Sequence, residues 1–259
     1  MSITLTTDFG STDHFVGAMK GVILGIAPRA RIVDIAHGIA PFDVNEAAFT
    51  IAQAWRWFPE GTIHVVVVDP GVGTARRPIL VEAGGQRFIG PDNGVFTLVY
   101  DACPHKVRAI GNPRLMLKEV SRTFHGRDVF APAAAHLARG VAPGRFGKIV
   151  HDFVRSAGIK PVMTKKNRWM GKVLKVDRFG NLITNFHIDE FGGVRTRTFE
   201  MLAGSGIIRR LAGTYAESGA GEVTAIVGSS GFLEISVNQG SAAERLGCGA
   251  GAELELETS

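Results

Sequence analysis

A run of β-branched residues, interrupted only by His64, occupies residues 62–68 (Thr-Ile-His-Val-Val-Val-Val) and limits the possible folds of this chain. Such a run without polar alternation is typical of a central strand that is covered on both faces. Further strands are predicted at residues 3–7, 31–36, 87–89 and 107–110. Helical spacing of apolar residues is found at residues 15–26, 45–58 and 129–139. The alternation predicts an α/β domain with a mostly parallel sheet flanked by helices.

The pattern changes after residues 158–161, Gly-Ile-Lys-Pro. Short alternating stretches between Gly, Asn and Ser residues follow at 171–176, 222–227, 232–237 and 253–257. This pattern is typical of a small antiparallel barrel or sandwich. We therefore predict an α/β domain over residues 1–160 and a smaller C-terminal, antiparallel β-barrel-like domain over residues 168–259.

The composition argues against several classes of protein. The net charge is +5, but Lys and Arg are spread along the chain apart from the short run at residues 165–168, so no nucleic-acid partner is expected. Cys103 and Cys248 lie far apart without a Cys/His cluster, so neither a zinc site nor a disulfide framework is expected. No apolar run approaches the roughly 20 residues that span a bilayer, and the N-terminus lacks a signal-like segment. We therefore expect a cytoplasmic protein without a membrane partner.

Two groups of polar residues follow predicted strands of the first domain, at the edge where α/β sheets bind ligands. Asp8 directly follows the first strand, and an ionised carboxylate there can accept hydrogen bonds from both hydroxyls of a ribose. Asp13 either caps the next helix or faces the same ligand. The second group is residues 68–74, Val-Asp-Pro-Gly-Val-Gly-Thr, whose glycines form a plain tight turn or let the backbone approach a ligand closely.

Four further polar groups stand at residues 90–94 (GPDNG), 123–128 (TFHGRD), 177–185 (DRFGNLITN) and 228–231 (GSSG). Each has a structural explanation when it is taken alone, since Pro-Asp-Asn-Gly is a strong turn signal and His125 precedes a helix start. The chain has no phosphate-binding loop motif and no GxGxxG after a strand. It also lacks an HExxH motif or comparable ligand spacing, so a metal-dependent hydrolase is not supported and no metal is predicted.

The order VDPGVG, GPDNG, HGRD and DRFGN resembles the S-adenosylmethionine (SAM) hydroxide adenosyltransferases. These enzymes belong to a superfamily with the SAM-dependent fluorinase and chlorinase, and the resemblance runs from about Ile3 to the last predicted strand. It implies cleavage of SAM by water to adenosine and methionine, with no cofactor, since SAM is the substrate. It also implies a homotrimer, because the family builds each site between the first domain of one subunit and the second domain of its neighbour.

The resemblance also implies roles for single residues. Asp8 would hold the ribose hydroxyls, Asp13 would lie near the methionine and ribose end, and Phe42 would lie against the ribose. In the second domain, adenine would be bound by Asn181 and by the backbone of Val237 and Gln239 beside Asn238. The methionine group would be bound by Asp177, Ser229 and Ser230. Glu234 and Phe179 are two further implied substrate contacts. For Phe179 a pure packing role is the alternative.

The residues around the nucleophile favour water. Asp69, Arg76 and His125 match the Asp-Arg-His set of the hydroxide adenosyltransferases, whereas the halogenases carry a tyrosine at the position of Asp69. Fluorinase has a serine at the position of Gly126, but chlorinase has glycine there, so Gly126 argues only against fluoride. Fluorinase also has a long insertion that is absent from the short link at residues 81–89. A carboxylate would repel a halide ion, but it can accept a hydrogen bond from water.

Within this set, His125 is a credible general base, with Asp69 orienting the water and Arg76 fixing Asp69. The reverse assignment of base and orienting group stays open. Arg77 is adjacent to Arg76, and Arg76 is assigned to this set because of its spacing from Asp69. For either arginine, the alternative role is a surface salt bridge. Two other functions remain open: a halide-using enzyme of the superfamily and a non-catalytic sensor of SAM or adenosine.

Overall fold

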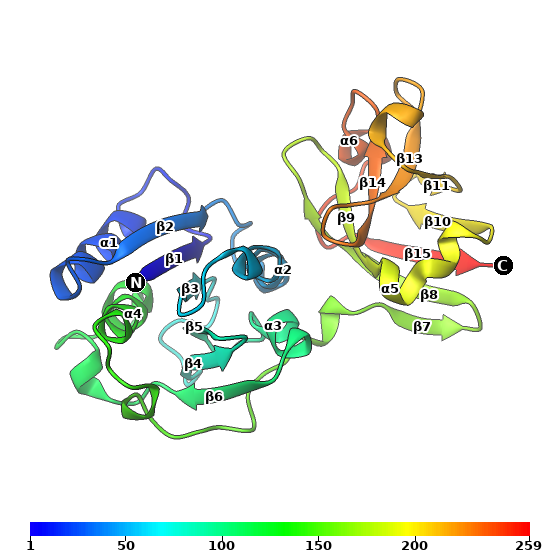
Figure 1. Cartoon of the computed structure of the whole chain (residues 1–259). Coiled ribbons are helices and arrows are strands. Elements are labelled where there is room, and N and C mark those ends of the chain that lie inside the picture. The colour runs from blue at the N-terminus through cyan, green and yellow to red at the C-terminus, as the bar shows by residue number, and fades with distance from the viewer. The chain divides into compact units, whose positions relative to one another are not determined.

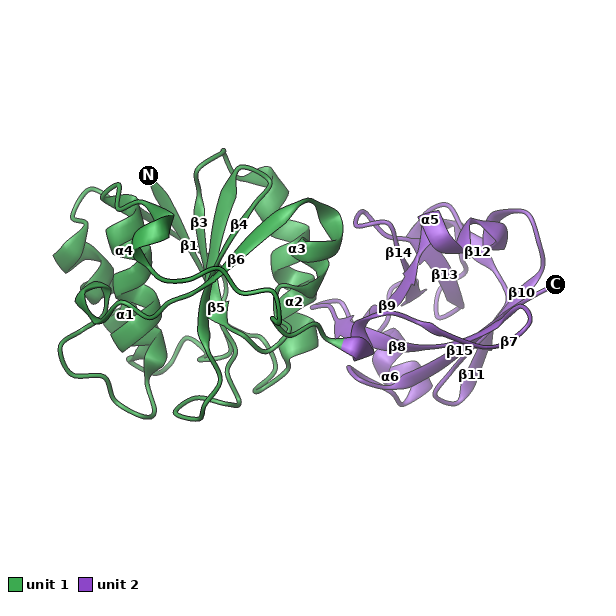
Figure 2. Ribbon diagram, turned by 90° about the horizontal axis from the view of Figure 1, so that it is seen from below, with its two compact units in different colours: residues 1–156 green, residues 157–259 purple.

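The computed structural model describes residues 1–259, which form two compact units, Met1–Ser156 (unit 1) and Ala157–Ser259 (unit 2) (Figure 2). Unit 1 contains a six-stranded sheet with the strand order β2-β1-β3-β5-β4-β6 (Figure 1). Its strands are β1 (Ser2–Thr7), β2 (Arg31–Ala36), β3 (Ile63–Val67), β4 (Pro78–Ala83), β5 (Gln86–Pro91) and β6 (His105–Ala109). Its helices are α1 (Phe15–Ile26), α2 (Val44–Ala54), α3 (Thr97–Ala102) and α4 (Ala131–Ala138).

The sheet of unit 1 is mixed, which corrects the predicted mostly parallel sheet. β2, β1, β3 and β5 pair in parallel, whereas β4 runs antiparallel to both β5 and β6. Gly84 and Gly85 both have positive φ angles, 55° and 74°, and reverse the chain between β4 and β5. The sequence pattern did not predict β4, whose last three residues, 81–83, lie in the stretch that was described as a short link.

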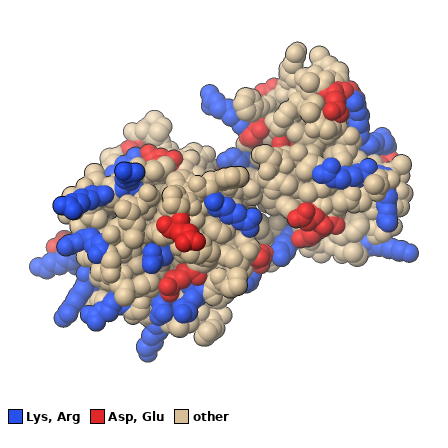
Figure 3. All heavy atoms as spheres, in the orientation of Figure 1, with Lys and Arg blue, Asp and Glu red and all other residues tan.

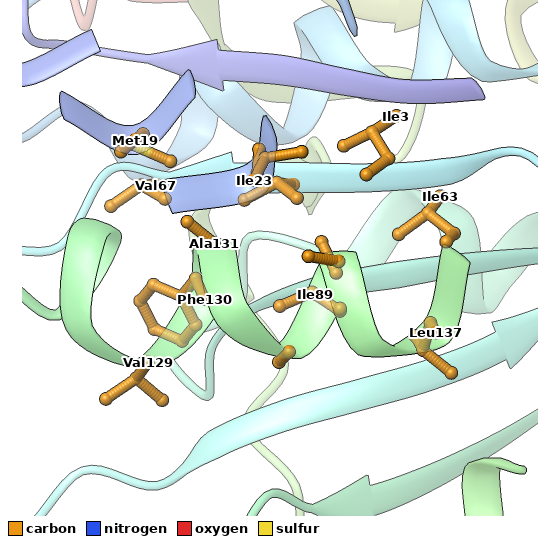
Figure 4. Packing of buried hydrophobic residues seen from close by; sticks show 14 of the residues in the cluster. Ile3, Met19, Ile23, Ile63, Val67, Ile89, Val129, Phe130, Ala131 and Leu137 are labelled. Atoms are coloured by element: carbon orange, nitrogen blue, oxygen red, sulfur yellow. The ribbon is translucent and has the colours of Figure 1, made fainter. Parts of the chain in front are cut away.

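The helices of unit 1 cover both faces of this sheet (Figure 2). α1 and α4 pack on one face with β1, β3 and β5, and Figure 4 shows Met19, Ile23 and Leu137 in this layer. α2 and α3 pack with the other face. Along β3 the side chains alternate between the two layers, Val65 and Val67 in one and Val66 in the other. The predicted central strand with two covered faces is thus confirmed.

The helix ends of unit 1 have different causes. Asp43 is the N-cap of α2, and its side chain accepts a hydrogen bond of 2.9 Å from the Glu46 N–H. α1 begins after His14 without a side-chain cap, so the capping role considered for Asp13 is wrong. A π-helical turn, Gly126–Phe130, leads directly into α4. Short 3-10 turns lie at Trp55–Trp57, Pro113–Leu115 and Pro143–Arg145.

Unit 2 is built on a nine-stranded sheet with the path β11-β10-β15-β8-β9-β14-β13-β12, and β7 pairs with β8 beside it. Its strands are β7 (Val162–Lys165), β8 (Arg168–Val176), β9 (Leu182–His187), β10 (Phe199–Ala203), β11 (Gly206–Ile208), β12 (Leu211–Ala212), β13 (Val223–Val227), β14 (Phe232–Val237) and β15 (Glu253–Thr258). The short helices are α5 (Ile188–Phe191) and α6 (Ala242–Leu246), with 3-10 turns at Ala157–Ile159, Gly192–Arg195 and Tyr215–Glu217.

Every strand pair of unit 2 is antiparallel except β12 with β13. The path is open, since it begins at β11 and ends at β12, so the predicted barrel-like sheet is a curled half-barrel. Its core contains Phe186, Leu233 and Ile235, which are fully buried.

The charged side chains are spread over the face of the molecule that Figure 3 shows. On the face drawn in Figure 3, Lys and Arg are scattered over both units and do not gather into one patch. None of the helices combines the length and the apolar character that crossing a bilayer requires.

Candidate active site

A cavity of about 310 Å³ opens in unit 1 at the carboxyl ends of two neighbouring parallel strands. Thr7 at the end of β1 pairs with Val67 at the end of β3, so Asp8 and Asp69 leave the sheet side by side. The residues that line the cavity are Asp8, Phe9, Asp13, Phe15, Pro41, Phe42, Val67, Asp69, Val72, Thr123, Phe124, His125 and Gly126. Five predicted site residues, Asp8, Asp13, Phe42, Asp69 and His125, therefore share one cavity.

Arg76 joins Asp69 to His125 through a continuous set of hydrogen bonds. Its Nε donates to Asp69 Oδ1 over 2.9 Å, and its Nη2 donates to Asp69 Oδ2. The same Nη2 donates to His125 Nδ1 over 2.8 Å. The side chains of Arg76 and Asp69 are almost completely buried, and the guanidinium carbon lies 5.3 Å from the centre of the Phe130 ring. The fork of the guanidinium thus fixes the orientation of both partners.

The Arg76 contact also determines the tautomer of His125. A guanidinium only donates hydrogen bonds, so His125 Nδ1 must accept, and the proton of the neutral ring is on Nε2. Burial, followed by the positive charge of Arg76, lowers the pKa of His125, although Asp69, Asp128 and a hydrogen bond to the Ser121 backbone act in the opposite direction. The ring is therefore neutral near pH 7, with a donor on Nε2.

Arg77 belongs to a different cluster from Arg76. It donates to Asp92 Oδ2 over 3.0 and 2.7 Å and to Asp152 Oδ1 over 2.8 Å. The other oxygen of the buried Asp92 accepts the Val154 N–H, and Asn93 donates to the Val68 carbonyl. The Pro-Asp-Asn-Gly turn thus has a structural role, as one of its two sequence interpretations stated.

Asp8 is held by the loop that follows β2. Its Oδ2 accepts a hydrogen bond of 2.9 Å from the Phe42 N–H. Burial, together with the negative charge of Asp69, raises the pKa of Asp8, while the Phe42 N–H partly offsets this shift. Phe42 has a φ of 68°, which is unfavourable for a bulky residue, and its side chain is 69% exposed. An exposed aromatic ring therefore stands beside the cavity carboxylate.

Three aromatic side chains that the sequence analysis did not single out form a wall of the cavity. Phe15 lies with its ring centre 5.5 Å from Phe9 and 5.1 Å from Phe124, and Phe9 lies 5.9 Å from Phe124. Phe9 and Phe124 stand inside the motifs TTDFG and TFHGRD, next to the polar residues that drew attention. That adjacency is the signal that would have identified them. Asp13, by contrast, is exposed at the rim.

Two glycines determine how closely the site loops approach each other. Gly73 has a φ of 76°, and a Cβ atom at this position would lie 2.2 Å from the Arg122 carbonyl oxygen. The loop that carries Asp69 and Arg76 therefore lies directly against the segment before His125. At Gly126 a Cβ atom would lie 3.2 Å from Met19 Sδ and from the Phe124 ring. A serine there, as in fluorinase, would require these neighbours to shift.

The predicted adenine and methionine contacts belong to unit 2. Asp177 Oδ1 accepts from the backbone N–H groups of Phe179 and Asn181 over 2.8 and 2.9 Å, and its Oδ2 accepts from Asn181 Nδ2 over 2.9 Å. The carboxylate thus organises the turn between β8 and β9. Asn181 is buried and keeps its side-chain oxygen as an acceptor, while Phe179 is 78% exposed and does not pack within this chain.

Glu234 lies near Asp177, and its side chain packs against Gly228 at the start of the Gly-Ser-Ser-Gly turn. It is buried and accepts a hydrogen bond of 3.2 Å from the Tyr215 hydroxyl. Burial, followed by the charge of Asp177, raises the pKa of Glu234, although the Tyr215 hydrogen bond opposes this effect. Ser230 Oγ is buried without a protein partner, whereas Ser229 is exposed.

The last three predicted residues stand at the end of β14. Val237 is buried, and Gln239 is exposed with a φ of 59°. Asn238 Nδ2 donates to the Ser218 carbonyl over 2.7 Å, and its own carbonyl accepts from Gly221. The Asn238 side chain thus holds the loop before β13. The backbone of Val237 and Gln239, on either side of it, is the part of this turn that the sequence predicts to contact adenine.

Both parts of the chain match domains of one protein family. Residues 3–147 match the SAM hydroxide adenosyltransferase N-terminal domain, and residues 171–255 match the C-terminal domain of the same family. The chain is 39% identical to an (R)-S-adenosyl-L-methionine hydrolase of Thermus thermophilus, covering 96% of this chain and 97% of that protein. It is 30% identical to a fluorinase of an Actinoplanes species, covering 91% and 90%. A solved structure of an uncharacterized conserved protein from Thermotoga maritima matches with a TM-score of 0.88 and 37% identity, covering 99% of each chain.

Proposed function

Because this chain belongs to the SAM hydroxide adenosyltransferase family, we propose that Asp69, Arg76 and His125 place water against the ribose C5′ of SAM. The protein is an S-adenosyl-L-methionine hydrolase that forms adenosine and L-methionine. The observation that carries the proposal is the hydrogen-bonded set in which Arg76 binds both Asp69 and His125 beside the cavity.

The tautomer of His125 supports one of the two open assignments of the general base. Its Nδ1 is occupied by Arg76, so its Nε2–H can donate to the attacking oxygen but cannot accept a proton. Each oxygen of Asp69 accepts one hydrogen bond from Arg76 and keeps a second acceptor position. We therefore propose that Asp69 accepts the proton of water and that His125 orients the oxygen. This reverses the preference drawn from the sequence.

The proposed step is a single displacement. The water oxygen forms a bond to C5′, the C5′–S bond breaks, and its electron pair stays on the sulfur of methionine. The proton of water passes to Asp69 and then to solvent. Attack of a hydroxide-like oxygen on a sulfonium removes charge, so a partly apolar cavity walled by Phe9, Phe15 and Phe124 favours it. Positioning supplies much of the acceleration because water is a weak nucleophile.

We further propose that the remaining substrate contacts come from unit 2 of a neighbouring subunit in a homotrimer. Asp8 would hold the ribose hydroxyls and Phe42 would lie against the ribose. Asn181 and the backbone of Val237 and Gln239 would bind adenine. The methionine group would be held by Asp177, Ser229, Ser230 and Glu234. The exposed rings of Phe42 and Phe179 support this arrangement, since large exposed aromatic side chains often mark a binding surface.

Product identification after incubation with SAM tests the proposed function. Adenosine and methionine are the expected products in the presence of chloride or fluoride, with no halogenated nucleoside. Chlorodeoxyadenosine would indicate a halide-using enzyme, and binding without turnover would indicate a sensor. We also propose that no metal takes part, so activity in excess chelator is expected to be complete. Loss of activity that a metal ion restores would contradict this.

Single-turnover reaction in ¹⁸O-labelled water, with enzyme in excess, tests direct attack. One labelled oxygen is expected at the 5′ hydroxyl of adenosine and none in methionine, and a substrate chirally deuterated at C5′ should show inversion. A covalent route through Asp69 would give retention with a labelled oxygen if water then displaced the carboxylate at C5′, or an unlabelled protein oxygen in the first product if water attacked the carbonyl of the ester. An unlabelled 5′ oxygen in that turnover would rule out the direct-water mechanism.

A further inference from the structure

We propose that Thr7 and His37 are positioning residues that aim the Asp8 carboxylate at the ribose hydroxyls. This proposal depends on the proposed function, in which Asp8 binds the ribose. Thr7 Oγ1 lies 2.9 Å from His37 Nδ1, and the Phe9 N–H donates to the same Thr7 oxygen over 3.2 Å. The residues on both sides of Asp8 are therefore engaged by one hydroxyl group.

The direction of these hydrogen bonds follows from their partners. His37 Nε2 lies 3.1 Å from Asp34 Oδ1, within ion-pair distance although outside ideal hydrogen-bond geometry. A carboxylate only accepts, so a singly protonated His37 ring carries its proton on Nε2 beside Asp34, and Nδ1 is then an acceptor. Thr7 therefore donates to His37 and accepts from Phe9. Lys20 holds the other oxygen of Asp34 over 2.6 Å and anchors the chain of contacts at the surface.

The same histidine ties together the two loops that meet at Asp8. The His37 carbonyl accepts from the Gly10 N–H over 2.7 Å, so its backbone fixes the loop after β1. The segment that starts at His37 continues to Phe42, whose N–H donates to Asp8 Oδ2 over 2.9 Å. Phe42 adopts its unfavourable positive φ in this loop. Loss of the Thr7–His37 contact would let the loops separate and turn Asp8 away from the cavity.

A hydrolytic triad is the obvious alternative for a threonine, a histidine and an aspartate in line. The burial of Thr7 excludes it, since this residue is 0% exposed and does not line the cavity. Its hydroxyl cannot reach a substrate, so its contacts act through Asp8. Thr7 and His37 are thus positioning residues and not catalytic ones.

The Thr7→Val variant, which keeps the shape of Thr7 and removes its hydroxyl, tests the proposal. The readout is the Kd of adenosine compared with that of 2′,3′-dideoxyadenosine, measured by calorimetry on the full-length protein. We expect adenosine binding to weaken about tenfold, the equivalent of one hydrogen bond to a charged group, while dideoxyadenosine binding changes by less than about twofold. KM for SAM rises more than kcat falls. Thr7→Ser, which restores the hydroxyl, recovers the wild-type ratio of the two Kd values.

Thr4→Val is the matched control, because Thr4 lies on the same strand and its Oγ1 contacts His64 Nδ1 over 2.7 Å. It removes a second buried Thr–His contact away from Asp8, so it lowers stability without changing the ratio. Asp8→Asn is the positive control, and it reduces the discrimination between the two nucleosides. Wild-type protein that fails to discriminate them contradicts the ribose-binding role of Asp8 in the proposed function, and the present proposal falls with it.

Two outcomes overturn the proposal alone, given a wild type that discriminates. The first is unchanged binding of both nucleosides by Thr7→Val, with the wild-type ratio of the two Kd values. The second is an equal loss of affinity for both nucleosides, which a general structural defect would produce. Should Thr7→Val fail to fold, Asp34→Ala replaces it, because that side chain is 40% exposed. It is expected to reduce the discrimination in the same direction by a smaller factor, and an unchanged ratio in this variant overturns the proposal.

Discussion

Arg76 shows how one side chain can set the state of two others. Its bidentate contact keeps the Asp69 carboxylate in one orientation, and its third hydrogen bond keeps the proton of His125 on Nε2. Lysine has no planar fork and cannot reproduce this geometry. The adjacent Arg77, with the same chemistry, is engaged by Asp92 and Asp152 instead.

His125→Ala and Asn181→Ala are expected to have opposite kinetic signatures. Loss of the His125 donor acts mainly in the transition state, so kcat falls by about a hundredfold with a small change in KM. Loss of Asn181 removes adenine recognition that is present throughout the reaction, so KM rises by roughly tenfold with a smaller change in kcat. Steady-state kinetics on both variants measure the contrast.

Asn185→Ala is the control for the second variant, since the Asn185 oxygen accepts from the Lys172 N–H and has no assigned substrate contact. It is expected to lower stability without a rise in KM. A kcat of His125→Ala within a factor of two of the wild type would remove His125 from the mechanism.

The acid limb of the pH–activity profile should lie below the ordinary histidine range. Burial and Arg76 lower the pKa of His125, so the neutral ring prevails at pH 7 and is lost only as the pH falls below about 6.5. Protonation puts a hydrogen on Nδ1, which breaks the contact with Arg76. We therefore expect kcat/KM to be constant near neutrality and to fall in acid. A rise of activity on acidification would contradict this assignment.

At the scale of elements, the loop after β3 brings the reacting groups together. Gly73 lets its backbone lie against the Arg122 carbonyl, and this contact places Asp69 and Arg76 beside His125. Gly73→Ala is expected to lower kcat by at least tenfold, because the new methyl group would force the two segments apart and misplaced groups lose catalytic power steeply. Steady-state assays and thermal unfolding measure the two effects.

Gly140→Ala is the matched control for this loop, because Gly140 also has a positive φ, 90°, but no atom lies within 4 Å of the added Cβ position. It should cost about 1 kcal/mol of stability from backbone strain and leave kcat unchanged. Equal loss of kcat in the two variants would show that strain, and not the close approach of the loops, explains the effect.

The strands β1, β3 and β5 are linked by a buried polar network that should make the fold sensitive to acid. His64 Nδ1 contacts Thr4 over 2.7 Å, its Nε2 contacts Gln86, and burial lowers the pKa of His64 to about 4. The unfolded chain binds this proton near pH 6.5, so the stabilisation is complete above that pH and is lost as the pH falls toward 4. The difference amounts to about 3 kcal/mol.

Denaturant unfolding of wild type and His64→Gln between pH 7 and pH 4 measures this contribution of His64 to the free energy of unfolding. The variant starts at lower stability, because its packing is altered, but it should lose less stability on acidification. Parallel pH dependence in the two proteins would assign the acid sensitivity to other groups.

At the scale of the whole molecule, the assigned residues are divided between two units with separate cores. If each site is completed by a neighbouring subunit, assembly and activity must be coupled. Light scattering should give three times the 27.7 kDa protomer mass, and specific activity should fall on dilution into the range where the trimer dissociates. An active monomer would refute the trimer.

The sequence by itself determined the local elements and the set of reacting residue types. The β-branched run at 62–68 became the doubly covered strand β3, and the spacing of apolar residues located α1 and α4, although a π-helical turn occupies the predicted start of the latter. The order of the motifs VDPGVG, GPDNG, HGRD and DRFGN also carried the resemblance to the family, and the family models and relatives confirm the family. The helices and strands depend on residues close in sequence, where periodicity and turn chemistry act directly.

Only the tertiary structure decided how those residues are paired. Arg76, and not Arg77, contacts Asp69 and His125, and this contact puts the His125 proton on Nε2. The sheet is mixed and not mostly parallel, and His37 lies against Thr7. Each of these outcomes depends on contacts between distant segments, in which the close approach at Gly73 or the reversal at Gly84 decides which partners meet. A linear pattern contains the donors and acceptors, but the packing of β1, β3 and their loops determines which of them lie within hydrogen-bond distance.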